Sequence, residues 1–198
     1  MSIISIGKKN RKTEVEIHHL FNGRWSPRSM TGEEMTQEEL LPLFEAAKWA
    51  PSSYNSQPWR FIIAHNKADR DKFLGFMVDF NKMWAKNAAA LVLITSLKNF
   101  EHNGKFSSTH SFDTGAAWMS LALEGARRGY VVHGMVGFDF EKSRQELKIP
   151  EDYHVEAMVA IGKLAKPKDL PKELAEMEKP SQRKPISDII SWGESKWK

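Results

Sequence analysis

Apolar residues recur along the chain both at helical spacing and in short unbroken runs, which predicts helices and strands mixed in one fold. Thr36 and Glu39 are the two ends of a capping box that begins a helix, and Pro51 stops that helix. Residues 113–128 are apolar on nearly every side, so they should form a buried helix of the kind often found between subunits. Further helices are expected at 67–80 and 141–147, and strands at 59–64, 88–95, 130–136 and 155–161.

Three stretches lack such a pattern. Residues 51–58 consist almost wholly of turn residues and amides, and residues 99–111 are polar, which predicts a mobile excursion. Residues 166–184 are rich in lysine and proline and show no apolar face, so they should wrap over a surface before a terminal stretch at 186–192. The mixture of elements predicts an α+β fold with a central sheet.

A chain of 198 residues can form one domain with a sizeable core, or a protomer that completes its core with a partner. No internal repeat or low-complexity linker divides it. We expect a single domain over 1–198, with the core at about 21–192, an N-terminal extension at 1–20 and a C-terminal wrapping segment at 166–198.

The composition is that of an ordinary globular protein, with 41% hydrophobic and 27% charged residues. The formal net charge of +4 suits a phosphate-bearing cofactor, but no long basic block is present, so nucleic-acid binding is not expected. The lack of cysteine excludes disulfides, thiolate metal sites and cysteine nucleophiles. A signal peptide carries its charges before its apolar stretch, whereas here the apolar patch near the start comes before the charges. No apolar run approaches the roughly 20 residues of a membrane span. We therefore expect a cytoplasmic protein without membrane attachment.

The polar loop between the capped helix and the first strand can carry chemistry. It places hydroxyls and amides close together in the order Pro51-Ser52-Ser53-Tyr54-Asn55-Ser56-Gln57-Pro58. Amides both donate and accept hydrogen bonds, so this loop can match the edge of a planar heterocycle such as a flavin. The alternative is a polar turn that caps its neighbours. Trp49 and Trp59 flank the loop and are expected to pack it in place.

Two groups of cations lie far apart in the sequence. Arg24 and Arg28 flank Ser26, a pattern that can place guanidinium forks and a hydroxyl around a phosphate or an anionic ring. Arg183 and Lys184 form a second basic pair near the end of the chain. For each group the alternative is a solvated basic turn.

Other chemistry finds little support in the sequence. The histidines lack the spacing of metal ligands, so no metal site is expected. The chain contains neither a G-x-S-x-G elbow nor a P-loop. It also lacks a dinucleotide fingerprint, so a nicotinamide cofactor would not bind in a Rossmann domain.

The order of these motifs resembles the nitroreductase family of flavoenzymes from about Phe21 to Trp192. The residues that carry the resemblance are Arg-x-Ser-x-Arg from Arg24, Pro-Ser-Ser-x-Asn-x-Gln-Pro-Trp from Pro51, Gly137-Phe138-Asp139 and Arg183-Lys184-Pro185. The loop from Pro51 is the most specific of them. The resemblance implies a mostly antiparallel central sheet flanked by helices, in an intertwined homodimer with FMN sites at its interface.

The resemblance also assigns roles to residues. Arg24, Ser26 and Arg183, together with Lys184, should hold the FMN phosphate, and Arg28 should lie near N1 and O2 of the ring, where a cation stabilises developing negative charge. At least one serine of the polar loop should reach the neighbouring subunit's site. The expected cofactor-binding residues are Arg24, Trp25, Ser26, Arg28, Pro51, Ser52, Ser53, Asn55, Gln57, Asn81, Met135, Val136, Gly137, Arg183 and Lys184. Tyr54 and Phe112 are expected to contact an aromatic acceptor.

The implied reaction is a ping-pong transfer: NADH or NADPH gives a hydride to N5 of FMN and leaves, and a nitroaromatic, quinone or enone then takes the electrons. No side chain is expected to be a catalytic residue. Trp84 stands where some members carry a lysine, which predicts a more strongly reducing flavin, and Val136 stands where others carry a glutamate. The alternatives are a flavin-binding sensor without turnover, a same-fold enzyme such as a reductive dehalogenase, and a non-enzymatic basic adaptor.

Overall fold

A four-stranded antiparallel sheet forms the centre of the computed structural model, which describes residues 2–197. The strands are β1 (Trp59–Ala64), β2 (Ala90–Leu97), β3 (Tyr130–Met135) and β4 (Tyr153–Lys163), in the order β1-β2-β4-β3. The expected central antiparallel sheet is confirmed. Strand β2 is buried at every residue because successive side chains enter opposite cores: Leu91 and Leu93 on one face, Val92 and Ile94 on the other.

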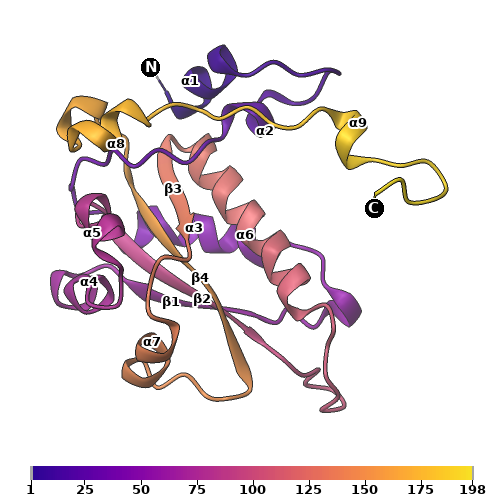
Figure 1. Cartoon of the computed structure of the whole chain (residues 1–198). Coiled ribbons are helices and arrows are strands. Elements are labelled where there is room, and N and C mark those ends of the chain that lie inside the picture. Colours follow the sequence, from indigo (N-terminus) through magenta and orange to yellow (C-terminus); the bar gives the residue numbers. More distant parts are fainter. Residues whose placement is uncertain (1, 198) are drawn as a thin grey trace.

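Helices cover both faces of this sheet (Figure 1). One face packs against α3 (Gln37–Lys48) and α6 (His110–Arg127), and the other against α4 (Lys67–Leu74), α5 (Asp79–Ala85) and α7 (Phe140–Glu146). The capping box predicted for α3 is present, with Thr36 Oγ1 accepting from the Glu39 N–H at 3.3 Å and Glu39 Oε2 accepting from the Thr36 N–H at 2.8 Å.

The single helix predicted at 67–80 is wrong. Helix α4 ends at Leu74, and α5 begins only at Asp79. Between them Met77 forms a β-bridge with Phe138, and the Val78 N–H donates to the Gly137 carbonyl at 3.1 Å. The sequence pattern remained helical across this break, so pairing with a distant part of the chain overrode it.

The N-terminal residues contain two helices that the apolar pattern did not predict, α1 (Ile3–Asn10) and α2 (His19–Gly23). Ile3 is only 1% exposed and belongs to the core. Gly7 of α1 lies so close to Gly23 that a Cβ on Gly7 would sit 1.9 Å from the Gly23 carbonyl oxygen. Only a glycine permits this approach, which fixes α1 directly beside the start of the Arg24 segment.

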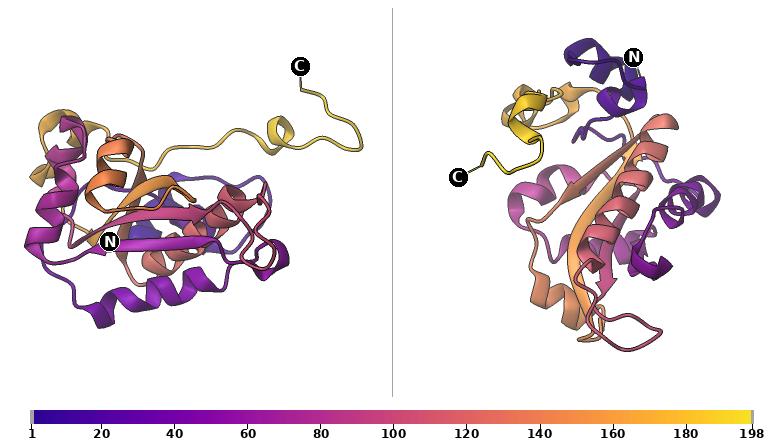
Figure 2. Two further views of the ribbon diagram at one scale, coloured as in Figure 1. Left: turned by 90° about the horizontal axis from the view of Figure 1, so that it is seen from below. Right: turned by 90° about the vertical axis from the view of Figure 1, so that its right-hand side faces the viewer.

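The prediction that residues 166–184 lack a buried face is wrong in part. Leu170 and Leu174 are 8% and 0% exposed and pack into the core around η2 (Pro167–Asp169) and α8 (Lys172–Glu176). Beyond them the chain continues as an extended arm that carries α9 (Ile186–Ile189) away from the body (Figure 2). None of the helices in the described part of the chain combines the length and the apolar character needed to cross a membrane.

Candidate functional site

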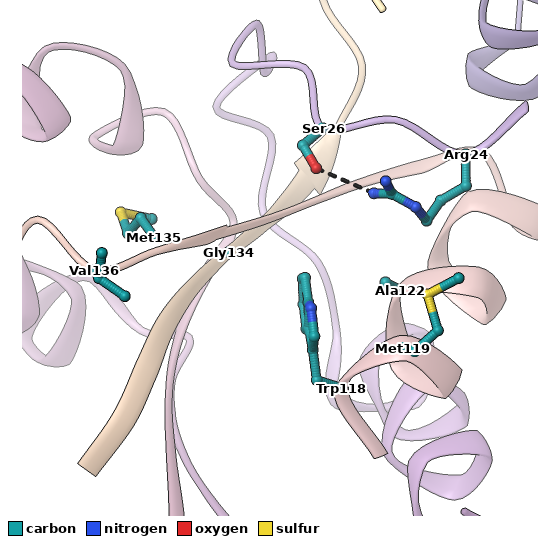
Figure 3. A pocket seen from close by; sticks show the side chains of 8 residues that line it. All are labelled: Arg24, Ser26, Trp118, Met119, Ala122, Gly134, Met135 and Val136. Atoms are coloured by element: carbon teal, nitrogen blue, oxygen red, sulfur yellow. Dashed lines mark hydrogen bonds between the residues drawn. The ribbon is translucent and has the colours of Figure 1, made fainter. Parts of the chain in front are cut away.

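A pocket of about 330 Å³ lies where the Arg24 segment crosses the edge strand β3 (Figure 3). Arg24 and Ser26 lie at one end, and the Arg24 Nη1 group donates to Ser26 Oγ at 3.1 Å. Gly134 is close enough to the Trp118 ring that a Cβ would be 3.1 Å from it, so the strand and α6 approach tightly here. The remaining lining residues are Met119, Ala122, Met135 and Val136. The structure thus brings four of the predicted residues, Arg24, Ser26, Met135 and Val136, to one pocket.

Arg24, at the cationic end of this pocket, forms no ion pair among residues 2–197, and neither does Arg183, which lines a different pocket together with Lys184, Arg11 and Glu14. The pKa of Arg24 is lowered, first by burial and then by the charge of Arg183. The two cations predicted as partners are 159 positions apart by subtraction of their numbers. Arg11 joins their segments, since it donates to the Arg24 carbonyl and to the Ser181 carbonyl that Arg183 also contacts. An anion between them would relieve this repulsion.

Trp25 and the guanidinium Nε of Arg28 are buried. Trp25 is 6% exposed and part of the core, so only its backbone is available to a ligand. The backbone N–H of Arg28 donates to both carboxylate oxygens of Glu178, at 2.8 and 3.0 Å, whereas the side-chain Nε of Arg28 is buried without a partner. A buried guanidinium donor with no acceptor indicates a missing hydrogen-bond partner.

Asn81 and Gly137, predicted to touch the ring edge, contact each other. The Asn81 side-chain amide donates to the Gly137 carbonyl at 3.1 Å, and a Cβ on Gly137 would lie 2.5 Å from the same nitrogen. Val136, the preceding residue, is 67% exposed. Trp84, which stands where a lysine is expected in some members of the resembled family, is 1% exposed, and the nearby Lys82 is paired with Asp79 at 3.0 Å.

The polar loop lies elsewhere, at the first turn of α6. The Ser53 N–H donates to Asp113 Oδ2 at 3.0 Å, and the Gln57 N–H donates to Ser52 Oγ at 3.0 Å. Tyr54, Asn55 and Gln57 have φ values of 52°, 52° and 46°. Three non-glycine residues in left-handed backbone within one loop represent stored strain, which is concentrated at functional sites.

The loop and the Arg24 pocket are separate within one chain. Asp113 anchors the loop, whereas Ala122 lines the pocket, and these residues are roughly 14 Å apart along α6 at about 1.5 Å per residue. No residue of 51–58 lines the Arg24 pocket. The loop residues and the pocket residues among those predicted therefore lie at different parts of the helix.

The prediction that Trp49 packs the polar loop is wrong. Trp49 is 77% exposed and donates through Nε1 to Glu45 at 3.2 Å, because α3 ends before it and its ring turns outward. Trp59 is 6% exposed in the core, as expected of the residue that begins β1. The loop is held by Asp113 and its own hydroxyls rather than by a pair of indoles.

The two predicted acceptor contacts are both exposed. Tyr54 is 82% exposed and packs edge-on against Phe100, with the ring centroids 5.6 Å apart. Phe112 is 80% exposed on the first turn of α6, and α6 itself begins three residues earlier than expected, at His110 rather than 113. The polar excursion is folded back on itself by a bridge between Asn99 and Phe106.

Three residues that position the site were not predicted: Arg11, Asp113 and Glu178. Each acts through hydrogen bonds to a backbone distant in sequence, and Glu178 accepts from the Ser29 N–H at 2.7 Å as well as from Arg28. No spacing rule links such partners. The acidic side chain of Asp113 in the first turn of a helix was the only available signal.

His133, on the far side of β3 from the pocket residue Gly134, makes stability depend on pH. Its Nδ1 lies 2.9 Å from the Pro27 carbonyl, so this nitrogen carries the proton. Burial, more than the charges of Arg28 and Arg24, lowers the pKa of His133 below its ordinary value of 6.5. The unfolded chain therefore binds a proton more readily than the native one as the pH falls below 6.5.

We expect the free energy of unfolding to fall as the pH drops from 7.5 to 5.5, and His133→Gln to reduce that slope, by at most about 1.4 kcal/mol per pH unit. Urea unfolding at several pH values measures it. His110, whose pKa burial also lowers, should leave a residual slope of the same sign. If the free energy of unfolding depended on pH with the same slope in the wild type and in His133→Gln, the role given to His133 would be contradicted.

Comparisons with known proteins agree with this architecture. The family model described as "Nitroreductase family" matches residues 22–82. Protein DrgA of Synechocystis sp. is 31% identical over 157 residues, covering 65% of this chain and 74% of DrgA. An oxygen-insensitive NADPH nitroreductase of Helicobacter acinonychis is 41% identical over 66 residues, covering 33% of this chain and 31% of that enzyme. A crystal structure of an oxidoreductase containing FMN matches with a TM-score of 0.91 at 43% identity, covering 95% of this chain and 97% of that one.

The fold and the pocket define an α+β protein with a cationic site at the edge of an antiparallel sheet. The chain belongs to the nitroreductase family. This membership confirms the resemblance drawn from the Arg24, Pro51 and Arg183 motifs.

Proposed function

We propose that this protein is an FMN-dependent oxidoreductase that takes a hydride from NADH or NADPH and passes electrons to a small oxidised acceptor. The observation that carries the proposal is the pocket bounded by β3 and Trp118, with Arg24 at its head and Arg183 tied to the Arg24 segment through Arg11 and the Ser181 carbonyl. A nucleotide phosphate is the anion that this arrangement fits. The similar oxidoreductase of solved structure contains FMN, and the Helicobacter relative is an NADPH nitroreductase.

The residues present fit FMN. Arg24, Ser26 and Arg183, with Lys184, would bind the phosphate, and the unpartnered Nε of Arg28 would donate to the ring system. Asn81 and the backbone of 135–137 would frame one edge of the ring. Bound FMN would supply the exchange of a hydride, which no protein side chain can carry out.

The side chains of the site would then orient the bound FMN and stabilise its charge. Arg28 would stabilise negative charge near the ring, since a buried cation acts strongly where water is excluded. Trp118 forms a wall of the pocket, and the exposed Val136 leaves the end of β3 open. A nitroaromatic, quinone or enone acceptor suits such an open site, with Tyr54 and Phe112 as the proposed aromatic contacts.

We also propose that the whole chain is one domain and that two copies form a homodimer with the site at the interface. Helix α6 exposes Phe112 and Met119, 80% and 38% accessible, on the side that lines the pocket, and Val136 adds to this apolar surface. Large apolar side chains exposed in this way are typical of a protein interface. A partner covering it would bring its own 51–58 loop toward the Arg24 pocket, which that loop does not reach within one chain.

Two measurements test the dimer. Sedimentation equilibrium should give twice the chain mass of 22.7 kDa. In mixtures of Arg24→Ala and Asn55→Ala chains, the heterodimer should regain one intact FMN site, because both defects fall in the other site. A monomer, or mixtures that bind no better than either variant alone, would contradict the shared site.

The function itself is tested by the absorbance spectrum of the purified protein and by anaerobic addition of NADH and of NADPH. We expect a yellow protein that at least one nicotinamide bleaches, and recovery of the colour on adding a quinone or nitroaromatic. A yellow protein that neither donor bleaches would indicate a flavin-binding sensor. A colourless protein that stays empty in excess FMN would overturn the proposal.

A further inference from the structure

Arg11 lies outside every motif discussed so far, yet it joins three parts of the chain. Its Nη1 group donates to the carbonyls of Arg24, at 2.5 Å, and of Asn22, at 3.2 Å. Its Nε group donates to the Ser181 carbonyl at 2.8 Å. One guanidinium therefore fastens the Arg24 segment to the C-terminal arm.

The Ser181 carbonyl is also where Arg183 is held. Arg183 Nη1 donates to it at 3.4 Å and to the Ser181 hydroxyl at 2.9 Å, so Arg11 and Arg183 share one acceptor. Two more contacts bind the arm to the same N-terminal segment: the Gln182 side chain donates to the Asn10 carbonyl at 2.6 Å, and the Ile186 N–H donates to Glu14 at 2.9 Å. The arm has little other support, since α9 contains no buried residue.

The attachment at Arg11 is itself rigid. Helix α1 is anchored by Ile3 in the core and by the contact of Gly7 with Gly23, the residue before Arg24. Figure 1 shows α1, α2 and the arm together at one end of the molecule. The N-terminal segment is thus placed to set the distance between Arg24 and Arg183.

The charges of the three arginines favour an anion beside them. Burial, followed by the charges of Arg183 and Arg24, lowers the pKa of Arg11 to about 10. Within residues 2–197 Arg11 makes no ion pair, and all of its hydrogen bonds go to backbone carbonyls. Three cations held near one another without an ion pair among residues 2–197 repel one another, so a dianionic phosphate is a group that would stabilise them.

We propose that Arg11 is a positioning residue of the phosphate site, which holds Arg183 of the arm against the Arg24 segment so that both can bind one phosphate group. This inference rests on the proposed function, since the phosphate is that of FMN. It assigns to the N-terminal extension a part in cofactor specificity, namely preference for FMN over riboflavin, which lacks the phosphate.

The test compares FMN and riboflavin binding to the full-length apoprotein by quenching of flavin fluorescence. Arg11→Gln should weaken FMN binding about tenfold, or about 1.4 kcal/mol, and leave riboflavin binding within about twofold. Arg11→Lys should rescue little, because an ammonium group cannot reach the three carbonyls that the guanidinium fork reaches. Lys9→Gln, on the same N-terminal helix, is the matched control and should bind both flavins as the wild type does.

A double-mutant cycle shows whether Arg11 acts through the arm. Arg183→Gln and Arg11→Gln together should cost less than the sum of the two, because each loses the same phosphate contact. Full additivity, an equal loss of FMN and riboflavin affinity, or an unchanged FMN affinity would overturn the inference while leaving the proposed function intact. A wild-type protein that binds neither flavin would overturn the proposed function and this inference with it. Circular dichroism of each variant separates loss of folding from loss of the phosphate contact.

Discussion

Arg24→Gln should weaken FMN binding about 10- to 100-fold. Arg24 is the partly buried cation that lines the pocket, and its bond to Ser26 already directs the guanidinium toward the space above β3. A hydrogen bond to a charged group contributes about 1.5–3 kcal/mol, which corresponds to a loss of this size. The dissociation constants of FMN and riboflavin, measured by fluorescence titration, give the result.

Riboflavin binding should change little in Arg24→Gln, because the lost contact is to the phosphate. Arg127→Gln is the matched control: it also removes a guanidinium, but one that is 60% exposed, paired with Glu124 at the C-terminal end of α6, and not part of the pocket lining. An equal loss of affinity for both flavins would show that Arg24 supports the site as a whole and does not bind the phosphate.

Trp84→Ala should lower the free energy of unfolding by about 3–5 kcal/mol, or roughly 6–20 °C in Tm. The Trp84 ring is 1% exposed, and its centroid lies 4.5 Å from that of His133 on β3. Its removal leaves a cavity beneath the strand that forms the floor of the pocket, and a packed core relaxes only partly around such a cavity. Urea unfolding and thermal unfolding of the apoprotein measure the effect.

Trp49→Ala makes the same change at a residue that is 77% exposed. It should alter stability by no more than about 0.5 kcal/mol, as surface substitutions do. Similar losses for the two variants would contradict the burial described for Trp84, and a stable Trp84→Ala protein would show that β3 is supported from its other face.

The local elements were predictable where one signal acts within a few residues. The capping box of Thr36 and Glu39 begins α3 as expected, and β1 spans the predicted residues 59–64. Where a distant partner competes, the local signal failed: Met77 pairs with Phe138 and breaks the expected helix, and Leu174 enters the core from a segment predicted to show no apolar face.

The same division applies to the site. The sequence by itself determined the chemistry available, namely the arginines, hydroxyls and amides of the Arg24, Pro51 and Arg183 motifs, because these are side-chain properties that need no neighbours. Only the tertiary structure decided that the segments of Arg24 and Arg183 lie side by side, and that Asp113 holds the polar loop at another place on α6. The role of Arg11 is visible only in the tertiary structure. Its hydrogen bonds to backbone carbonyls depend on how segments far apart in the chain pack together, and no residue pattern in the sequence marks such bonds.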